Sequence, residues 1–108
     1  MAAERTEREK HSLADINQVI HAPARLMILS YLYVVESADY VFIMRQTGLT
    51  WGNLSTHLAK LEEAGYVDVK KEFKGRKPHT TLSLTRRGRS AFREYKKSMQ
   101  QILDDLPD

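Results

Sequence analysis

Residues 48–65 read GLTWGNLSTHLAKLEEAG, and most of the fold can be inferred outward from this stretch. Thr50 offers an N-cap hydroxyl for a helix that starts at Trp51 and runs to about Ala64, and Gly65 is placed to end that helix. The leucines recur at four- and three-residue steps, which predicts an amphipathic helix with one stripe packed inward. This leucine stripe consists of Leu54, Leu58 and Leu61.

A second short helix is expected directly upstream, over residues 40–47. Asp39 is placed to cap it, and Gly48 is placed to stop it. Two short helices joined by about three residues that include a glycine form a helix-turn-helix. The sequence therefore predicts this motif over residues 39–65.

Two more helices are expected before the motif. Residues 23–36 have a broad apolar face that is typical of a core helix. A short first helix is expected to be capped by Ser12 or Asp15 and to end near Ile20. Residues 37–39 are expected to form a break in the chain.

The exposed face of the helix over residues 51–64 suits contact with DNA. Its first half carries small, hydrogen-bonding side chains, and a helix with such a face can enter the major groove where bulky residues would block it. Asn53 can pair bidentately with adenine, whereas Lys60 suits a phosphate. The face consists of Gly52, Asn53, Thr56, Ala59, Lys60 and Glu63, flanked by Ser55. The alternative is an ordinary amphipathic helix with a polar outer face.

After Gly65 the apolar pattern changes from helical to alternating. Residues 66–70 alternate from Val67 onward, as half-buried strands do, and residues 79–84 resume a β-rich pattern after a loop over residues 75–78. This predicts a β-hairpin with a basic tip that can lie along phosphates and send an arginine into the minor groove. The basic tip consists of Lys74, Arg76 and Lys77. The alternative is an exposed hairpin whose lysines prevent aggregation.

A final helix is expected from about Arg86 to Leu106, with Thr85 as its cap. Its apolar residues recur at three- and four-residue steps, and we predict that they pair with a second copy of the chain, helped by the first helix. The predicted dimer interface consists of Ile16, Ile20, Phe92, Tyr95, Met99, Ile102, Leu103 and Leu106. The alternative is that part of this stripe covers the core of its own domain.

The pattern L-T-x-G-N-L-S-x-H-L-x-K-L-E-x-A-G-Y-V over residues 49–67 resembles the winged helix-turn-helix regulators related to the MarR and ArsR families. The likeness is greatest to a small group whose members look like a bare DNA-binding domain. Residues 20–29, 74–80 and 84–88 resemble the start of that group's second helix, its wing and the start of its last helix. The resemblance spans about residues 13–105. It implies a homodimer that acts on promoters.

The resemblance also implies DNA contacts from positions 50–60 and from the wing. The predicted contacts are Thr50, Trp51, Gly52, Asn53, Ser55, Thr56, Lys60, Lys74, Arg76 and Lys77. Trp51 departs from the pattern, because a tryptophan is unusual at a groove-facing site. We expect it to pack at the edge of the core or to abut the sugar-phosphate backbone. The absence of cysteine separates the chain from thiol-based metal sensors of the ArsR type.

Charge supports a polyanionic partner. Between Asp68 and Lys97 there are eleven lysines and arginines against three acids, although the whole chain has a net charge of only +3. A basic half on a nearly neutral protein is the footprint expected of nucleic-acid binding. The chain has no cysteine and no apolar run of the roughly 20 residues that a bilayer span needs. We therefore expect a cytoplasmic protein that makes no membrane contact.

We predict a single α+β, mostly α domain of 108 residues. It comprises a polar tail over residues 1–12, a winged helix-turn-helix over residues 13–85 and a dimerisation helix over residues 86–108. The predicted function is a homodimeric transcriptional regulator that binds double-stranded DNA. The main alternative is a winged-helix module that binds proteins, which would have no need of a basic hairpin tip. A binder of single strands would need a row of exposed aromatic side chains for stacking.

No catalytic, metal or cofactor site is predicted. The four histidines are scattered, and none is paired with a carboxylate at metal-ligand spacing. The chain has five glycines, none of them in a phosphate-cradling run. An enzyme is therefore not expected. A small-molecule effector would fit between the last helix and the DNA-binding core, but no residue cluster identifies one.

Overall fold

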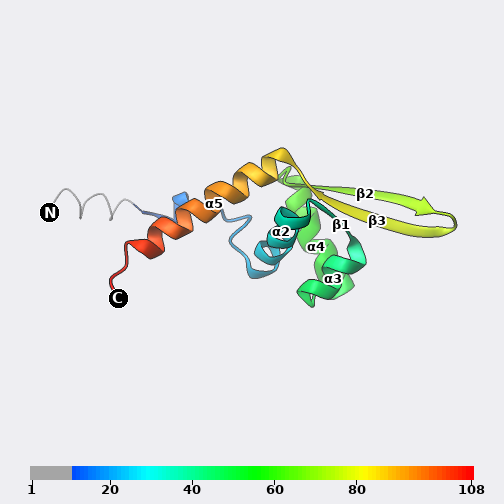
Figure 1. Cartoon of the computed structure of the whole chain (residues 1–108), viewed down its shortest axis with the longest axis horizontal. Coiled ribbons are helices and arrows are strands. Elements are labelled where there is room, and N and C mark those ends of the chain that lie inside the picture. Colours follow the sequence, from blue (N-terminus) through cyan, green and yellow to red (C-terminus); the bar gives the residue numbers. More distant parts are fainter. Residues whose placement is uncertain (1–10) are drawn as a thin grey trace.

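The computed structural model describes residues 11–108, so most of the tail expected over residues 1–12 lies outside the described residues. Within that range, four α-helices and a three-stranded antiparallel sheet confirm the expected α+β, mostly α class (Figure 1). The elements in chain order are η1 (Leu13–Asp15), α2 (Pro23–Val35), β1 (Ser37–Asp39), α3 (Tyr40–Thr47), α4 (Trp51–Glu63), β2 (Val67–Lys74), β3 (Lys77–Leu84) and α5 (Arg86–Asp104).

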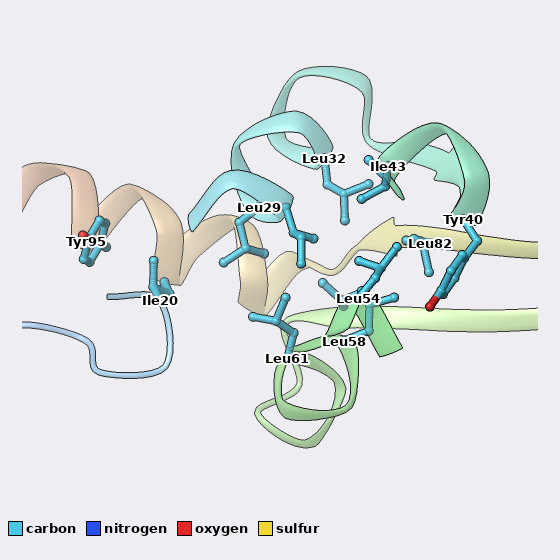
Figure 2. Packing of buried hydrophobic residues seen from close by; sticks show 12 residues of the cluster. Ile20, Leu29, Leu32, Tyr40, Ile43, Leu54, Leu58, Leu61, Leu82 and Tyr95 are labelled. Carbon is cyan, nitrogen blue, oxygen red and sulfur yellow. The ribbon is translucent and has the colours of Figure 1, made fainter. Parts of the chain in front are cut away.

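The core lies where α2, α3, α4 and the base of the hairpin meet (Figure 2). The leucine stripe of α4 is buried, with no member more than 3% exposed. Burying a leucine fully stabilises a fold by about 1.5–3 kcal/mol, so the stripe fixes which face of α4 remains outside. The other elements contribute Ile28, Leu29, Leu32, Ile43, Val67 and Leu82.

Three helices begin at the polar caps that the sequence predicts. The side chains of Asp39, Thr50 and Thr85 accept hydrogen bonds from the backbone N–H three residues on, at 2.8, 3.2 and 2.9 Å. Such a cap is worth about 1 kcal/mol. Gly48 and Gly65 follow α3 and α4 with φ of 74° and 81°, the left-handed region that ends a helix and favours glycine. The predicted bounds of both helices are therefore confirmed to within a residue.

The first helix is not formed as expected. Only the single 3₁₀ turn η1 is helical, and the chain is irregular from there to α2. The amide oxygen of Asn17 accepts hydrogen bonds from the backbone N–H of Val19 at 3.0 Å and of Ile20 at 3.1 Å. Asparagine side chains that bond the backbone in this way compete with helix formation, which explains why the apolar spacing did not produce a helix.

The sheet has the strand order β1-β3-β2, and the β2–β3 hairpin is longer than the sequence predicts. The register runs from Val67 opposite Leu84 to Lys74 opposite Lys77, so only residues 75–76 form the turn. The expected loop over residues 75–78 is therefore wrong, because Pro78 lies within β3. Proline is tolerated there because β1 pairs only with residues 81–83, which leaves the outer part of β3 as an edge on that side.

The last helix and the hairpin leave the helical centre in opposite directions, as Figure 1 shows. The segment that precedes α2 lies beside α5 and is tied to it by side chains. Nδ1 of His21 lies 2.9 Å from the hydroxyl oxygen of Tyr95, and Nε2 of His11 lies 2.8 Å from a carboxylate oxygen of Asp105. This segment therefore covers one side of α5, the helix that the sequence predicts to pair with a second copy of the chain.

Candidate nucleic-acid interface

The outward face of α4 carries every residue that the sequence predicts to contact DNA on this helix. Because the leucine stripe points into the core, these side chains lie on the exposed side of the helix. The exposed set is Trp51, Gly52, Asn53, Ser55, Thr56 and Lys60, preceded by the exposed cap Thr50. The first turns of α4 thus present an amide, two hydroxyls and a glycine within one short surface.

Two hydroxyls on this face already donate hydrogen bonds within the chain. The hydroxyl of Thr56 donates to the carbonyl oxygen of Gly52 at 3.0 Å. The hydroxyl of Tyr40 donates to the carbonyl oxygen of Trp51 at 2.6 Å, so its oxygen accepts the 2.6 Å bond from Ser55. Thr56 and Ser55 therefore offer free lone pairs rather than free hydrogens.

Tyr40 holds the first turn of α4, a role that no pattern in the sequence indicates. It is the first residue of α3 and only 6% exposed. Its ring lies 4.3 Å, centroid to centroid, from the indole of Trp51, which remains 59% exposed. Trp51 therefore packs against the edge of the core while presenting most of its surface outward. The contact joins residues on two different helices, so no periodicity within either helix reveals it.

A hollow of about 340 Å³ separates α4 from the hairpin. Trp51, Ser55 and Glu62 line it from the helix, and Lys71 and Thr80 line it from the strands. The outward face of α4 and the hairpin are thus two projecting surfaces with a mixed polar and apolar hollow between them. One strand of a polymer could lie in this hollow, with α4 on one side of it and the hairpin on the other.

The hairpin brings the three basic residues of its predicted tip together. Lys74 and Lys77 lie opposite each other in the last rung of the ladder, and Arg76 lies in the two-residue turn. Gly75 supplies the left-handed conformation of that turn, with φ of 67°. All three basic side chains are exposed. Three positive charges at the end of a projecting hairpin can reach a polyanion that the core itself does not touch.

A family model described as a winged helix DNA-binding domain matches residues 24–103. The chain belongs to this family. The match begins at the start of α2 and ends near the end of α5, so it includes α4 and the hairpin. In this winged helix domain, α4 is the second helix of the helix-turn-helix, the position called the recognition helix, and the β2–β3 hairpin is the wing. The expectation drawn from the motif over residues 49–67 is confirmed at the level of the family.

Two similar proteins show how far the likeness of this winged helix domain extends. An uncharacterized protein of Methanocaldococcus jannaschii is 34% identical over 89 residues, which cover 82% of this chain and 97% of that protein. The structure of a transcriptional regulator homologue from Pyrococcus horikoshii OT3 is 28% identical with a TM-score of 0.78 and covers 96% of this chain and 99% of its own.

A more distant structure has the same fold. The PcaV transcriptional regulator from Streptomyces coelicolor, solved in complex with its natural ligand, is 19% identical to this chain with a TM-score of 0.65. The likeness covers 98% of this chain and 78% of PcaV. The family match and the solved regulators place this winged helix domain among DNA-binding regulators and not among enzymes.

A cationic group that sequence reasoning missed lies behind the recognition helix. Arg25 of α2 donates from Nε to the carbonyl oxygen of Val19, and from Nη1 to Nδ1 of His57 at 3.2 Å. It therefore links the segment before α2 to α4. Burial, and then the charges of Arg25 and Lys60, hold the pKa of His57 below its ordinary value. These contacts position the recognition helix from the side away from Tyr40.

The predicted dimer residues divide into three groups by exposure. Ile20 is 0% exposed and Tyr95 is 7% exposed, because the segment before α2 packs against α5 (Figure 2). Their side chains are used in the chain's own core and leave little surface for a partner chain, so the dimer role of these two residues stays a prediction. Leu103 and Leu106 are about 60% exposed, at 59% and 61%. The remaining members, Ile16, Phe92, Met99 and Ile102, are half-buried.

Two further observations concern the described residues. Within residues 11–108, no three histidine, cysteine, aspartate or glutamate side chains gather where they could hold a metal ion. None of the helices in the same range combines the length and the apolar character needed to cross a membrane.

Proposed function

We propose that this chain is a transcriptional regulator that binds double-stranded DNA as a homodimer, with α4 in the major groove and the wing at the adjacent minor groove. The observation that carries the proposal is that the outward face of α4 and the β2–β3 hairpin lie on either side of one hollow. The exposed basic tip is the end of that same hairpin. In this pose the backbone of one DNA strand lies in the hollow, between the two grooves.

The proposed base contacts come from the first turns of α4. Asn53 is exposed and can bond N6 and N7 of adenine, and Gly52 lets the helix approach the base edges. Ser55 and Thr56 accept hydrogen bonds, because both hydroxyl protons are already used within the chain. We assign Lys60 to a phosphate, and Trp51 to the sugar-phosphate backbone because its indole lines the hollow.

The proposed dimer forms through the apolar surface that α5 leaves open. Leu103 and Leu106 supply its most exposed part, and Leu13, 78% exposed, lies in the segment that runs beside α5. Ile16, Phe92, Met99 and Ile102 remain candidates for its half-buried rim. A two-fold axis at this surface would direct two α4 helices to half-sites about one helical turn apart.

The experiment that tests DNA binding is fluorescence anisotropy of a labelled mixed-sequence duplex, titrated with the protein at several salt concentrations. Log affinity should fall steeply with log salt, because each neutralised phosphate releases counterions. A Lys74→Ala/Lys77→Ala variant should reduce the magnitude of the slope by about 2. A Lys96→Ala/Lys97→Ala variant removes two exposed lysines from α5 and should leave the slope unchanged.

Two results would contradict the proposal. An absence of duplex binding at low salt would favour the winged-helix module that binds proteins. An equal loss of slope in both lysine variants would mean that binding follows the overall charge of the chain and does not depend on the wing.

A further inference from the structure

An exposed aromatic side chain lies next to the basic wing tip. Phe73 is 73% exposed and lies directly opposite Pro78 in the ladder. Side chains directly opposite each other in an antiparallel pair have Cβ atoms about 4.5–5.5 Å apart. Phe73 and Pro78 therefore form one small apolar surface, one rung behind the lysine pair that flanks the turn.

This apolar pair lies on the face of the wing that continues from the core. Side chains alternate between the two faces of a strand, so every second rung lies on the same face. The rungs that pack on the core are Val67–Leu84 and Val69–Leu82. The alternation places the Phe73–Pro78 rung on that same side, and Pro78 lines a second hollow of about 240 Å³ together with Trp51. The pair thus faces the side where the recognition helix lies.

The surroundings of the pair indicate the chemistry of its partner. Lys71 precedes Phe73 on the same face of β2, Lys74 follows Phe73, and Arg76 lies in the adjacent turn. The intervening Glu72 lies on the other face, where its carboxylate is 3.9 Å from the ammonium of Lys70. A partner that accepts an apolar surface inside a cluster of cations must be negatively charged outside and apolar within. The minor groove of DNA has this character, because deoxyribose lines its walls between two rows of phosphates.

The dimensions of the wing tip agree with those of the groove. Each residue of a strand advances about 3.3 Å, so the turn projects about 7 Å beyond the Phe73–Pro78 rung. The minor groove is about 7.5 Å deep. When Arg76 reaches into the groove, the apolar rung therefore lies at the level of the sugars along the groove mouth.

We propose that Phe73 and Pro78 pack on the deoxyribose walls of the minor groove and supply a part of the DNA affinity that does not depend on salt. This inference rests on the proposed function, since it assumes that the wing contacts duplex DNA. Apolar side chains contact minor-groove DNA in architectural proteins, where they add surface that charge alone does not provide. Lys74, Arg76 and Lys77 would then supply the salt-dependent part, and the apolar rung the remainder.

The test compares Phe73→Ala with the parent in the anisotropy titration across salt. Affinity should fall about tenfold at every salt concentration, with the slope of log affinity against log salt unchanged. Phe73→Leu should restore most of the loss. The matched control is Val34→Ala, which truncates an 81% exposed apolar side chain on α2 and should bind as the parent does. Unchanged melting temperatures would confirm that each variant is folded.

The other outcomes are distinguishable. Equal binding by Phe73→Ala and the parent overturns the apolar contact and leaves the proposed function intact. A shallower slope in Phe73→Ala also overturns it, because the substitution would then act through the neighbouring charges. If the parent itself binds no duplex, the proposed function fails and the inference fails with it. A change in the mass of the free protein with DNA binding unchanged would instead assign Phe73 to a protein contact.

Discussion

Gly88, in the first turn of α5, packs against the backbone carbonyl of Tyr66 so closely that a Cβ at this position would overlap it. The same carbonyl accepts a hydrogen bond from the N–H of Thr85 at 3.0 Å, and the hydroxyl of Thr85 donates to the carbonyl oxygen of Gly65 at 2.6 Å. These contacts join the end of the recognition helix to the start of α5. The position of α4 relative to the proposed dimer surface is therefore fixed where the backbone at residues 65–66 crosses the start of α5.

Gly88→Ala should destabilise the protein by about 2 kcal/mol or more, because the nearest obstructing atom is the backbone carbonyl oxygen of Tyr66, which cannot rotate away. Gly52→Ala is the matched control. That glycine lies within α4 and has no positive φ, and a methyl group added there would meet no atom within 4 Å. The control change should therefore stabilise the helix by about 0.5–1 kcal/mol. Urea unfolding measures the free energy of unfolding of both variants. Equal values would contradict the close packing of Gly88 on the backbone of Tyr66.

The pH dependence of stability should carry a contribution from His57. Its pKa is lowered in the folded chain by burial and by Arg25 and Lys60, so the unfolded chain takes up the proton first as the pH falls. Its stabilising contribution is fully present above the unfolded pKa, which is about 6.5, and is lost as the pH falls from there toward the folded pKa. Urea unfolding should show that, as the pH falls from 8 to 5, the free energy of unfolding decreases more for the parent than for His57→Gln. A constant difference between the two proteins across that range would refute this role.

Arg76→Ala should weaken DNA binding, and most strongly on duplexes whose flanks have a narrow, AT-rich minor groove. The negative potential that attracts an inserted arginine is greatest in such grooves. Lys77→Ala is the comparison, because a phosphate contact should cost the same on every flank. Anisotropy on AT-rich and GC-rich duplexes gives, for each variant, the ratio of the affinity losses on the two kinds of flank. If the ratio is the same for both variants, Arg76 does not enter the groove.

Leu103→Glu/Leu106→Glu should convert the proposed dimer to monomers. Both side chains are more than half exposed within the chain, so the change should leave the fold intact while placing charges in the interface. Gln101→Glu adds a charge to an exposed position of the same helix that lies about 200° around the axis from Leu103, and it should remain dimeric. Sedimentation velocity gives the masses. A dimer that survives the double change would move the interface elsewhere.

The sequence predicted the elements whose signals are local. Helices α3 and α4 carry a cap, a periodic stripe and a terminal glycine within their own residues, and their bounds were predicted to within a residue. The wing was predicted as a hairpin, because its strands alternate on either side of a glycine. The length of the wing was not predicted, because a proline normally marks a loop. Pro78 lies within β3 here because that part of the strand is at the edge of the sheet.

Features that depend on distant partners were missed. Strand β1 has three residues and exists through its pairing with β3, more than 40 residues later. The bonds from Tyr40 to α4, and from Arg25 to His57, also join separate elements. The apolar spacing near Ile20 predicted a dimer surface, but the segment packs against α5 and Ile20 is buried in the core. Periodicity identifies a face that must be covered without identifying what covers it.

The proposed function depends above all on α4 reading a base sequence in duplex DNA. Selection of bound duplexes from a random pool measures this property without assuming an operator. We predict enrichment of a two-fold related sequence whose half-site centres lie about one helical turn apart, and Asn53→Ala should relax the preference at one position of each half-site. Recovery of bound DNA with no enriched sequence, from a protein that binds with a steep salt dependence, would contradict sequence recognition by α4.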